Sequence, residues 1–166
     1  MTKTSGPVAA FDDAIGRART AEDAYRALYE LTRDTVGVKL FTVMTIDIEA
    51  GLARRAYTND PEAYPTSGTK PIRRDEWFGQ MEEGRQPYLA TSIPAVKEQF
   101  PDHELIASLG CGSVINLPVI LGDRLIATIN LLDAEGIYSE EHARRTEAEL
   151  SVPAKLACLV ALQEKA

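Results

Sequence analysis

The sequence has few cysteines and no long apolar run. Its two cysteines, Cys111 and Cys158, cannot form a disulfide framework, and a reducing compartment is the default for such a chain. No apolar run approaches the roughly 18 residues of a membrane span, and no apolar segment of signal-peptide type follows the polar N-terminus. We therefore expect a cytoplasmic protein with no membrane partner.

Positive charge and histidine are also scarce. The chain has 18 Lys and Arg residues against 25 Asp and Glu residues, which gives a net charge of −7. Nucleic-acid binding needs a clustered basic surface, so we expect no nucleic-acid partner. The two histidines and two cysteines match no zinc-ligand spacing, and we expect no metal site.

Length and composition are those of one globular domain. The chain has 166 residues, of which 45% are hydrophobic and 26% are charged. A chain of this size buries about 70% of its unfolded-state surface, so it needs no cross-links to hold a core. No repeat or linker divides it. We expect a single domain over residues 1–166, with residues 1–7 flexible.

Both ends of the chain have helical patterns. Apolar residues recur at intervals of three and four from Val8, and Thr20 can cap a second helix that ends before Gly37, which predicts two helices over 8–36. Ser139 can cap a final helix over 139–164. Pro153 should bend that helix, because its ring displaces the carbonyl one turn earlier.

Between the helices, the pattern indicates hairpins. Residues 38–48 alternate and are rich in β-branched side chains, and residues 52–59 form the return strand. Residues 112–121 and 124–133 are nearly all apolar, which is typical of strands covered on both faces, and Gly122-Asp123 is a favoured two-residue turn. Consecutive hairpins imply an antiparallel sheet.

The middle of the chain is less regular. Residues 59–73 contain three prolines, so no regular element can continue through them. Short helices are predicted over 75–84, from Pro94 and from Asp102 to Leu109, with a short strand over 88–90. The predicted class is α+β, with the terminal helices covering one face of the sheet.

At this point the sequence resembles the GAF domain family of small-molecule sensors. The similarity is most specific in Ser113-Val114-Ile115-Asn116-Leu117-Pro118-Val119-Ile120 and the following Gly122 to Leu132, which look like the late hairpin of GAF domains. Ala127 stands where many members have glycine. The resemblance implies a central sheet of five or six antiparallel strands, with loops and short helices roofing a pocket on the face away from the terminal helices. It also implies a sensor in signal transduction.

The cofactor motifs of the family are missing. Bilin-binding members attach the chromophore through a cysteine followed by histidine, whereas Cys111 precedes Gly112 and Cys158 precedes Leu159. The signature of cyclic-nucleotide-binding members is also absent. We expect no cofactor, although haem ligation through His103 stays open.

Seven residues besides Cys111 are candidate ligand-binding residues. Tyr57 and Tyr64 flank the proline-rich segment, and Lys70 suits a carboxylate-bearing ligand. Trp77 and Phe78 are candidates for a pocket wall, with ordinary packing as the alternative. The last two candidates are Asn116 and Asn130.

The two asparagines interrupt strands that are otherwise apolar. A buried amide needs hydrogen-bonding partners, which either a ligand or loop backbone can supply. If strand alternation places Asn116 and Asn130 on the roofed face, they could orient a polar ligand.

Cys111 carries an alternative, enzymatic hypothesis. Its flanking glycines would allow a ligand to approach closely, and His103 could activate its thiol. One GAF subfamily, the free methionine-(R)-sulfoxide reductases, uses cysteine chemistry. Its members carry several cysteines between the loop and this hairpin, whereas residues 59–73 have none. The competing interpretation is a small buried side chain at a strand start.

We expect a small-molecule-binding regulatory GAF domain without its own output domain. Its signal would pass through a partner or through a homodimer formed by the terminal helices, for which the candidate residues are Leu156, Ala157, Val160 and Ala161. A third hypothesis is a structural dimerisation module with no ligand.

Overall fold

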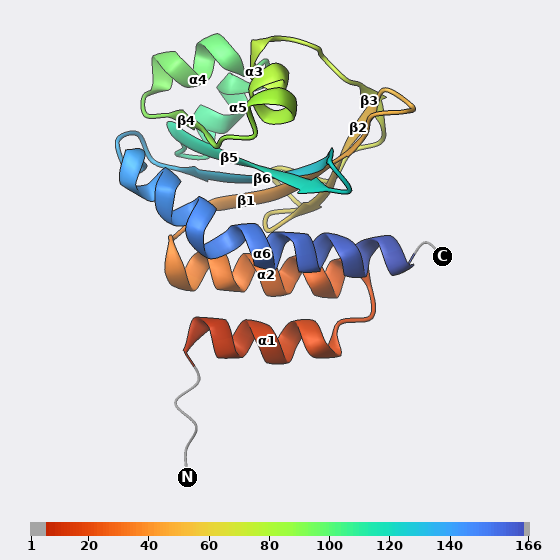
Figure 1. Ribbon diagram of the computed structural model, residues 1–166. Helices are drawn as coiled ribbons and strands as arrows, with labels where there is room; N and C mark the ends of the chain where they lie inside the picture. Colours follow the sequence, from red (N-terminus) through yellow and green to blue (C-terminus); the bar gives the residue numbers. More distant parts are fainter. Residues whose placement is uncertain (1–5, 165–166) are drawn as a thin grey trace.

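A computed structural model of the chain describes residues 6–164 (Figure 1). The predicted flexibility of residues 1–5 lies outside the described residues. The same prediction is wrong for Pro7, which begins the first helix. Proline suits the first helical position because the N–H group it lacks would have no intrahelical acceptor there.

Six antiparallel strands form one sheet in the order β3-β2-β1-β6-β5-β4. The strands are β1 (Leu40–Asp47), β2 (Leu52–Thr58), β3 (Lys70–Pro71), β4 (Tyr88–Ala90), β5 (Ser113–Leu121) and β6 (Arg124–Asp133). This sheet confirms the predicted α+β class. β3 corrects the prediction that residues 59–73 hold no regular element, because Lys70 pairs with Ala53 of β2.

Three helices lie on one face of the sheet. They are α1 (Pro7–Arg17), α2 (Ala21–Thr35) and α6 (Glu140–Glu164). Figure 1 shows α2 and α6 side by side against the sheet, with α1 in a further layer beyond α2. The α2 cap is as predicted, because the Thr20 hydroxyl accepts from the Asp23 N–H at 3.0 Å. α6 continues through Pro153, and its axis changes direction along its length.

Short helices and the 59–73 loop roof the other face. The helical elements are α3 (Glu76–Gly79), the π-helical turn η1 (Gln80–Gly84), α4 (Ile93–Gln99) and α5 (His103–Ser108). Asp75 caps α3 by accepting from the Phe78 N–H at 3.0 Å, and Ser92 caps α4 by accepting from the Ala95 N–H at 3.3 Å. These local signals place aromatic side chains of the roof over the sheet.

A β-bulge in β2 decides which of its side chains face the roof. Val43 pairs with Tyr57 and Met44 pairs with Arg55, so Ala56 is an extra residue in β2. Side chains two residues apart normally share a face of a strand. The bulge breaks that rule, and Arg55 faces the roof while Tyr57 packs in the core under the helices.

Candidate ligand-binding pocket

A pocket of about 270 Å³ lies between the sheet and the roof. It is larger than the ~150 Å³ engineered cavity that holds a benzene and slightly below the ~300 Å³ lower end of drug-sized sites. Its size therefore suits a molecule with one ring or a short chain. Its apolar lining comes from both the sheet and the roof and includes Met44, Ile46, Ile72, Phe78, Phe100, Ile106, Val114 and Leu132.

A row of polar side chains crosses the floor of this pocket. The Trp77 indole N–H donates to the Asn116 side-chain oxygen at 2.9 Å, and the Asn116 amide donates to Asn130 at 2.8 Å. The Asn130 amide then donates to the Thr42 hydroxyl at 3.1 Å. The strand register produces this row, because Asn130 of β6 lies opposite Asn116 on β5 and opposite Thr42 on β1. All four residues line the pocket.

The row shows how the buried Asn116 amide and the partly buried Asn130 amide are hydrogen-bonded. Asn116 is 2% exposed and Thr42 is 3% exposed, so unpaired polar atoms there would be costly. Their partners are other side chains of the floor and the roof rather than loop backbone. Each asparagine side chain has two N–H donors and uses one of them within residues 6–164, which leaves one N–H on each amide for another acceptor.

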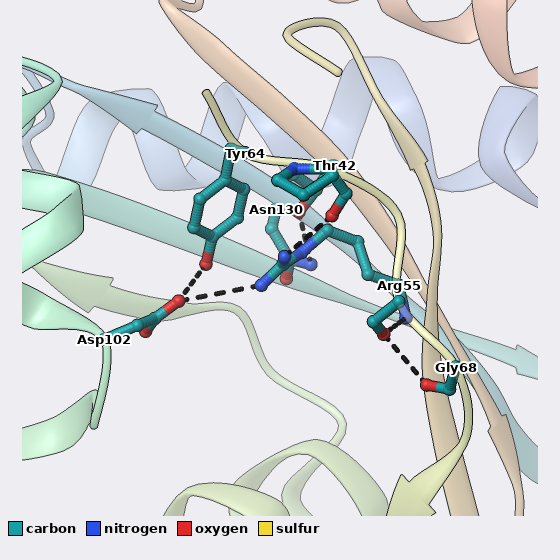
Figure 2. A network of polar contacts seen from close by, with 8 residues as sticks. Thr42, Arg55, Tyr64, Gly68, Asp102 and Asn130 are labelled. Atoms are coloured by element: carbon teal, nitrogen blue, oxygen red, sulfur yellow. Dashed lines mark hydrogen bonds and ion pairs between the residues drawn. The ribbon is translucent and has the colours of Figure 1, made fainter. Parts of the chain in front are cut away.

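Arg55, Tyr64 and Asp102 form a second polar group at one side of the pocket (Figure 2). The Arg55 guanidinium lies over the Tyr64 ring, 3.6 Å from its centroid. One Arg55 nitrogen donates to the Pro65 carbonyl at 2.9 Å, and another lies 3.6 Å from the Asp102 carboxylate. The Tyr64 hydroxyl donates to the same Asp102 oxygen. Burial, with the hydrogen bond to Asp102, raises the Tyr64 pKa, which keeps this hydroxyl a donor.

Backbone contacts at Arg55 fix the loop that carries Tyr64. The Arg55 N–H donates to the Ser67 hydroxyl at 3.0 Å, and the Ser67 N–H donates to the Arg55 carbonyl at 3.0 Å. The Ser67 hydroxyl in turn donates to the Gly68 carbonyl at 2.9 Å (Figure 2). The proline-rich segment is therefore tied to the sheet edge beside the pocket, although most of it lacks regular structure.

The charged residues of the pocket lining are mainly basic. Three are cationic and two are anionic, namely Arg55, Lys70, Arg73, Asp75 and Asp102, whereas Arg54 pairs with Thr45 and lies on the helix-covered face beside Tyr25. The difference is 3 − 2 = +1, in a chain whose net charge is −7. A positive site in an acidic protein favours an anionic ligand over a cationic one.

Six of the eight predicted ligand-binding residues line the pocket. They are Tyr64, Lys70, Trp77, Phe78, Asn116 and Asn130. Tyr57 is a correction, because the bulge turns it toward the helices, where its ring centroid lies 5.9 Å from that of Phe41 and 6.1 Å from that of Tyr25.

Cys111 is also a correction as a pocket residue. It is 3% exposed and packs in a cluster with Ile106 and Val114, outside the pocket lining. Burial raises the pKa of its thiol, which disfavours the nucleophilic thiolate. Its flanking glycines have structural reasons that involve no ligand. Gly110 has a φ of +80°, and a Cβ at Gly112 would lie 2.8 Å from the Ile93 side chain.

The other candidates for chemistry lie away from the pocket lining. His103 is the first residue of α5, where its backbone N–H donates to the Phe100 carbonyl at 3.2 Å. Cys158 lies on α6 under the opposite face of the sheet, and burial raises its pKa to about 12. Within residues 6–164, no group of three or more His, Cys, Asp and Glu side chains could hold a metal ion.

Sequence reasoning missed Arg55, Thr42 and Asp102. Arg55 lies in the predicted return strand, and its side chain is turned into the pocket wall, where it is 26% exposed. Asp102 reaches the pocket through the packing of α4 and α5. No local pattern in the sequence signals either placement.

Several solved structures share this fold. No protein-family model matches the sequence, and neither does any curated protein. The GAF domain of a two-component sensor histidine kinase from Bacillus halodurans is 13% identical, with 88% of this chain and 99% of that chain covered at a TM-score of 0.69. The GAF domain of a phosphoenolpyruvate-protein phosphotransferase from Coxiella burnetii is 14% identical, with 99% and 98% covered at 0.66.

A free methionine-R-sulfoxide reductase from Neisseria meningitidis, solved with its substrate, is also similar. It is 12% identical, with 99% of this chain and 92% of that chain covered at a TM-score of 0.58. Similarity at this level of identity shows a common fold. It does not show which chemistry the site carries out, which depends on the residues of the site. The chain has the GAF-domain fold, as the late hairpin predicted.

Among residues 6–164, no helix combines the length and the hydrophobicity required to cross a bilayer.

Proposed function

We propose that this chain is a sensory domain that binds a small molecule in the pocket between the sheet and the roof. The observation that carries the proposal is the row of hydrogen-bonded side chains from Trp77 to Thr42 on the floor of an otherwise largely apolar pocket. A few placed polar groups in an apolar cavity give a ligand orientation as well as affinity. The GAF-domain fold supports a sensory role.

The proposal can be tested with the single tryptophan of the chain. Trp77 lines the pocket, so its fluorescence should change when the pocket is filled. We would screen carboxylates, amides, nucleosides and amino acids for an increase in melting temperature, and then titrate each hit by Trp77 fluorescence.

Two alanine variants separate pocket binding from surface binding. Ala53→Leu places three extra carbons in the pocket lining, whereas Ala50→Leu makes the same change in an exposed turn. The proposal predicts hits that bind wild type and Ala50→Leu but lose affinity for Ala53→Leu. A screen without hits would favour the hypothesis of a structural module without a ligand.

The geometry does not favour the alternative of a thiol-dependent sulfoxide reductase. Cys111 is buried outside the pocket lining, and Cys158 lies on the other face of the sheet. An activity assay with free methionine sulfoxide and a reductant tests this directly. Turnover that Cys111→Ser abolishes would replace our proposal with the enzymatic one.

We also propose that the chain forms a homodimer through α6. Val152, Leu156 and Leu159 are 66%, 42% and 45% exposed, and their spacing of four and three places them on one stripe of the helix. Of the residues predicted for this interface, Leu156 is exposed, whereas Ala157 and Ala161 are buried in the core of the monomer and Val160 is partly buried against it. The proposed interface therefore keeps Leu156 and substitutes Val152 and Leu159 for the other three predicted residues.

A further inference from the structure

We propose that the ligand is a small carboxylate whose carboxylate group binds Arg55, in competition with Asp102. The inference rests on the proposed function, because it assigns chemistry to the ligand of the same pocket. It starts from an arginine in the pocket wall that is held in place and yet has most of its hydrogen-bonding capacity unused.

Arg55 is oriented by contacts that leave its donors available. The Tyr64 ring supports one face of the guanidinium at 3.6 Å, and the Pro65 carbonyl accepts one hydrogen bond at 2.9 Å. A guanidinium has five N–H donors, and within residues 6–164 this side chain donates only that one bond. A planar group fixed by a stack is prepared for bidentate binding of a carboxylate, because little side-chain freedom is lost.

Asp102 is an incomplete partner for this arginine. Its carboxylate lies 3.6 Å from the guanidinium, which is an ion pair beyond hydrogen-bonding distance. The same oxygen accepts from the Tyr64 hydroxyl, and the Asp102 side chain is 36% exposed. Partly exposed ion pairs contribute little free energy. A ligand carboxylate with two short hydrogen bonds to Arg55 can therefore displace Asp102 from the guanidinium, while Asp102 keeps its bond from Tyr64.

The surroundings favour a net anion with an apolar body. The charged side chains that face the pocket sum to 3 − 2 = +1, which favours an anionic ligand over a neutral zwitterion. Away from these charges, the lining is largely apolar and includes Met44, Ile106 and Leu132. With a volume of about 270 Å³, the pocket suits one ring or a short chain attached to the carboxylate.

Phenylacetate and phenylacetamide form a matched pair of probes, because they have nearly the same shape and differ in charge. Binding of each would be measured by calorimetry to wild type, Arg55→Gln and Asp102→Asn. The control is Arg33→Gln, since Arg33 also lies over a tyrosine ring and pairs with an aspartate, but on α2. Asparagine at position 102 still offers an oxygen to the Tyr64 hydroxyl, so this variant should keep the roof folded.

We expect wild type and Arg33→Gln to bind phenylacetate about tenfold more tightly than phenylacetamide, and Arg55→Gln to bind the two probes equally. Asp102→Asn should tighten phenylacetate binding severalfold and leave phenylacetamide binding unchanged. Because the Asp102→Asn result is independent of Arg55→Gln, the proposal stays testable if Arg55→Gln fails to fold.

Four results would overturn the inference, and the last of them would overturn the proposed function with it. Equal binding of the two probes to wild type would leave a pocket without a carboxylate preference, and the proposed function would stand. Tighter binding of L-phenylalanine than of phenylacetate, lost in Asp102→Asn, would show a zwitterion site. If neither probe binds at about 10 mM while the broad screen gives other ligands, the inference fails alone. A screen with no ligand at all would remove the proposed function as well.

Discussion

Replacing Asn130 with leucine should cost about 3 kcal/mol of the free energy of unfolding. Asn130 accepts from the Asn116 amide at 2.8 Å and donates to the Thr42 hydroxyl at 3.1 Å. Leucine makes neither bond, and each partner then loses a hydrogen bond in a mostly dry site. Leaving a buried polar group unpaired costs about 1–3 kcal/mol, and two partners are affected. The two losses together give a range of about 2–6 kcal/mol. Water in the pocket can replace part of the lost hydrogen bonding, so we expect a value in the lower half of that range.

The double variant Asn116→Leu/Asn130→Leu tests whether the contributions of the two asparagines to the free energy of unfolding depend on each other. The two residues share one hydrogen bond, so the double variant should cost about 1–2 kcal/mol less than the sum of the single variants. Urea unfolding followed by circular dichroism gives the free energy of unfolding of the two single variants and the double variant. An unchanged m-value shows that these free energies can be compared. A loss below about 0.5 kcal/mol for Asn130→Leu, or strict additivity, would refute the argument that the row is a connected network.

Three further predictions concern other parts of the molecule. Thr128→Val should raise the free energy of unfolding by about 1 kcal/mol, because the Thr128 hydroxyl is buried without a partner among residues 6–164. Thr146→Val is the control and should lower it, since the Thr146 hydroxyl donates to the His142 carbonyl at 2.7 Å; chemical denaturation checks both signs. The Cys111 thiol should resist a thiol reagent at pH 8 in the folded protein, because burial raises its pKa, and fast modification would contradict its placement. Leu156→Glu/Leu159→Glu should convert a dimer into an 18.2 kDa monomer in sedimentation equilibrium, and an unchanged mass would place the interface elsewhere.

The fold could be predicted from the sequence because its signals are local. The turn at Gly122-Asp123 requires two consecutive residues with positive φ, and the structure has φ values of 58° and 63° there. The caps at Thr20 and Asp75 mark the starts of α2 and α3. The apolar character of β5 and β6 predicted cover on both faces, and both strands lie inside the sheet and not at its edges.

The site could be predicted only in part, because one inserted residue changes the face of a strand. Alternation placed Asn116 and Asn130 together, since β5 and β6 stay in register there. In β2 the bulge at Ala56 breaks the alternation, so that Tyr57, which was predicted for the pocket, packs in the core and Arg55 faces the pocket. Asp102 depends on packing between segments far apart in the sequence, which single-residue patterns do not contain. Whether the lining residues bind a ligand stays a prediction.

The most direct test of the central claim is the indole N–H resonance of Trp77 in a ¹⁵N-labelled sample. The chain has one tryptophan, so the signal needs no assignment, and this N–H donates to Asn116 on the pocket floor. Titration with phenylacetate, or with any ligand from the screen, should shift the resonance saturably in wild type and Ala50→Leu, with weaker binding in Ala53→Leu. A ligand that raises the melting temperature but leaves this resonance in place would show that the pocket between sheet and roof is not the binding site.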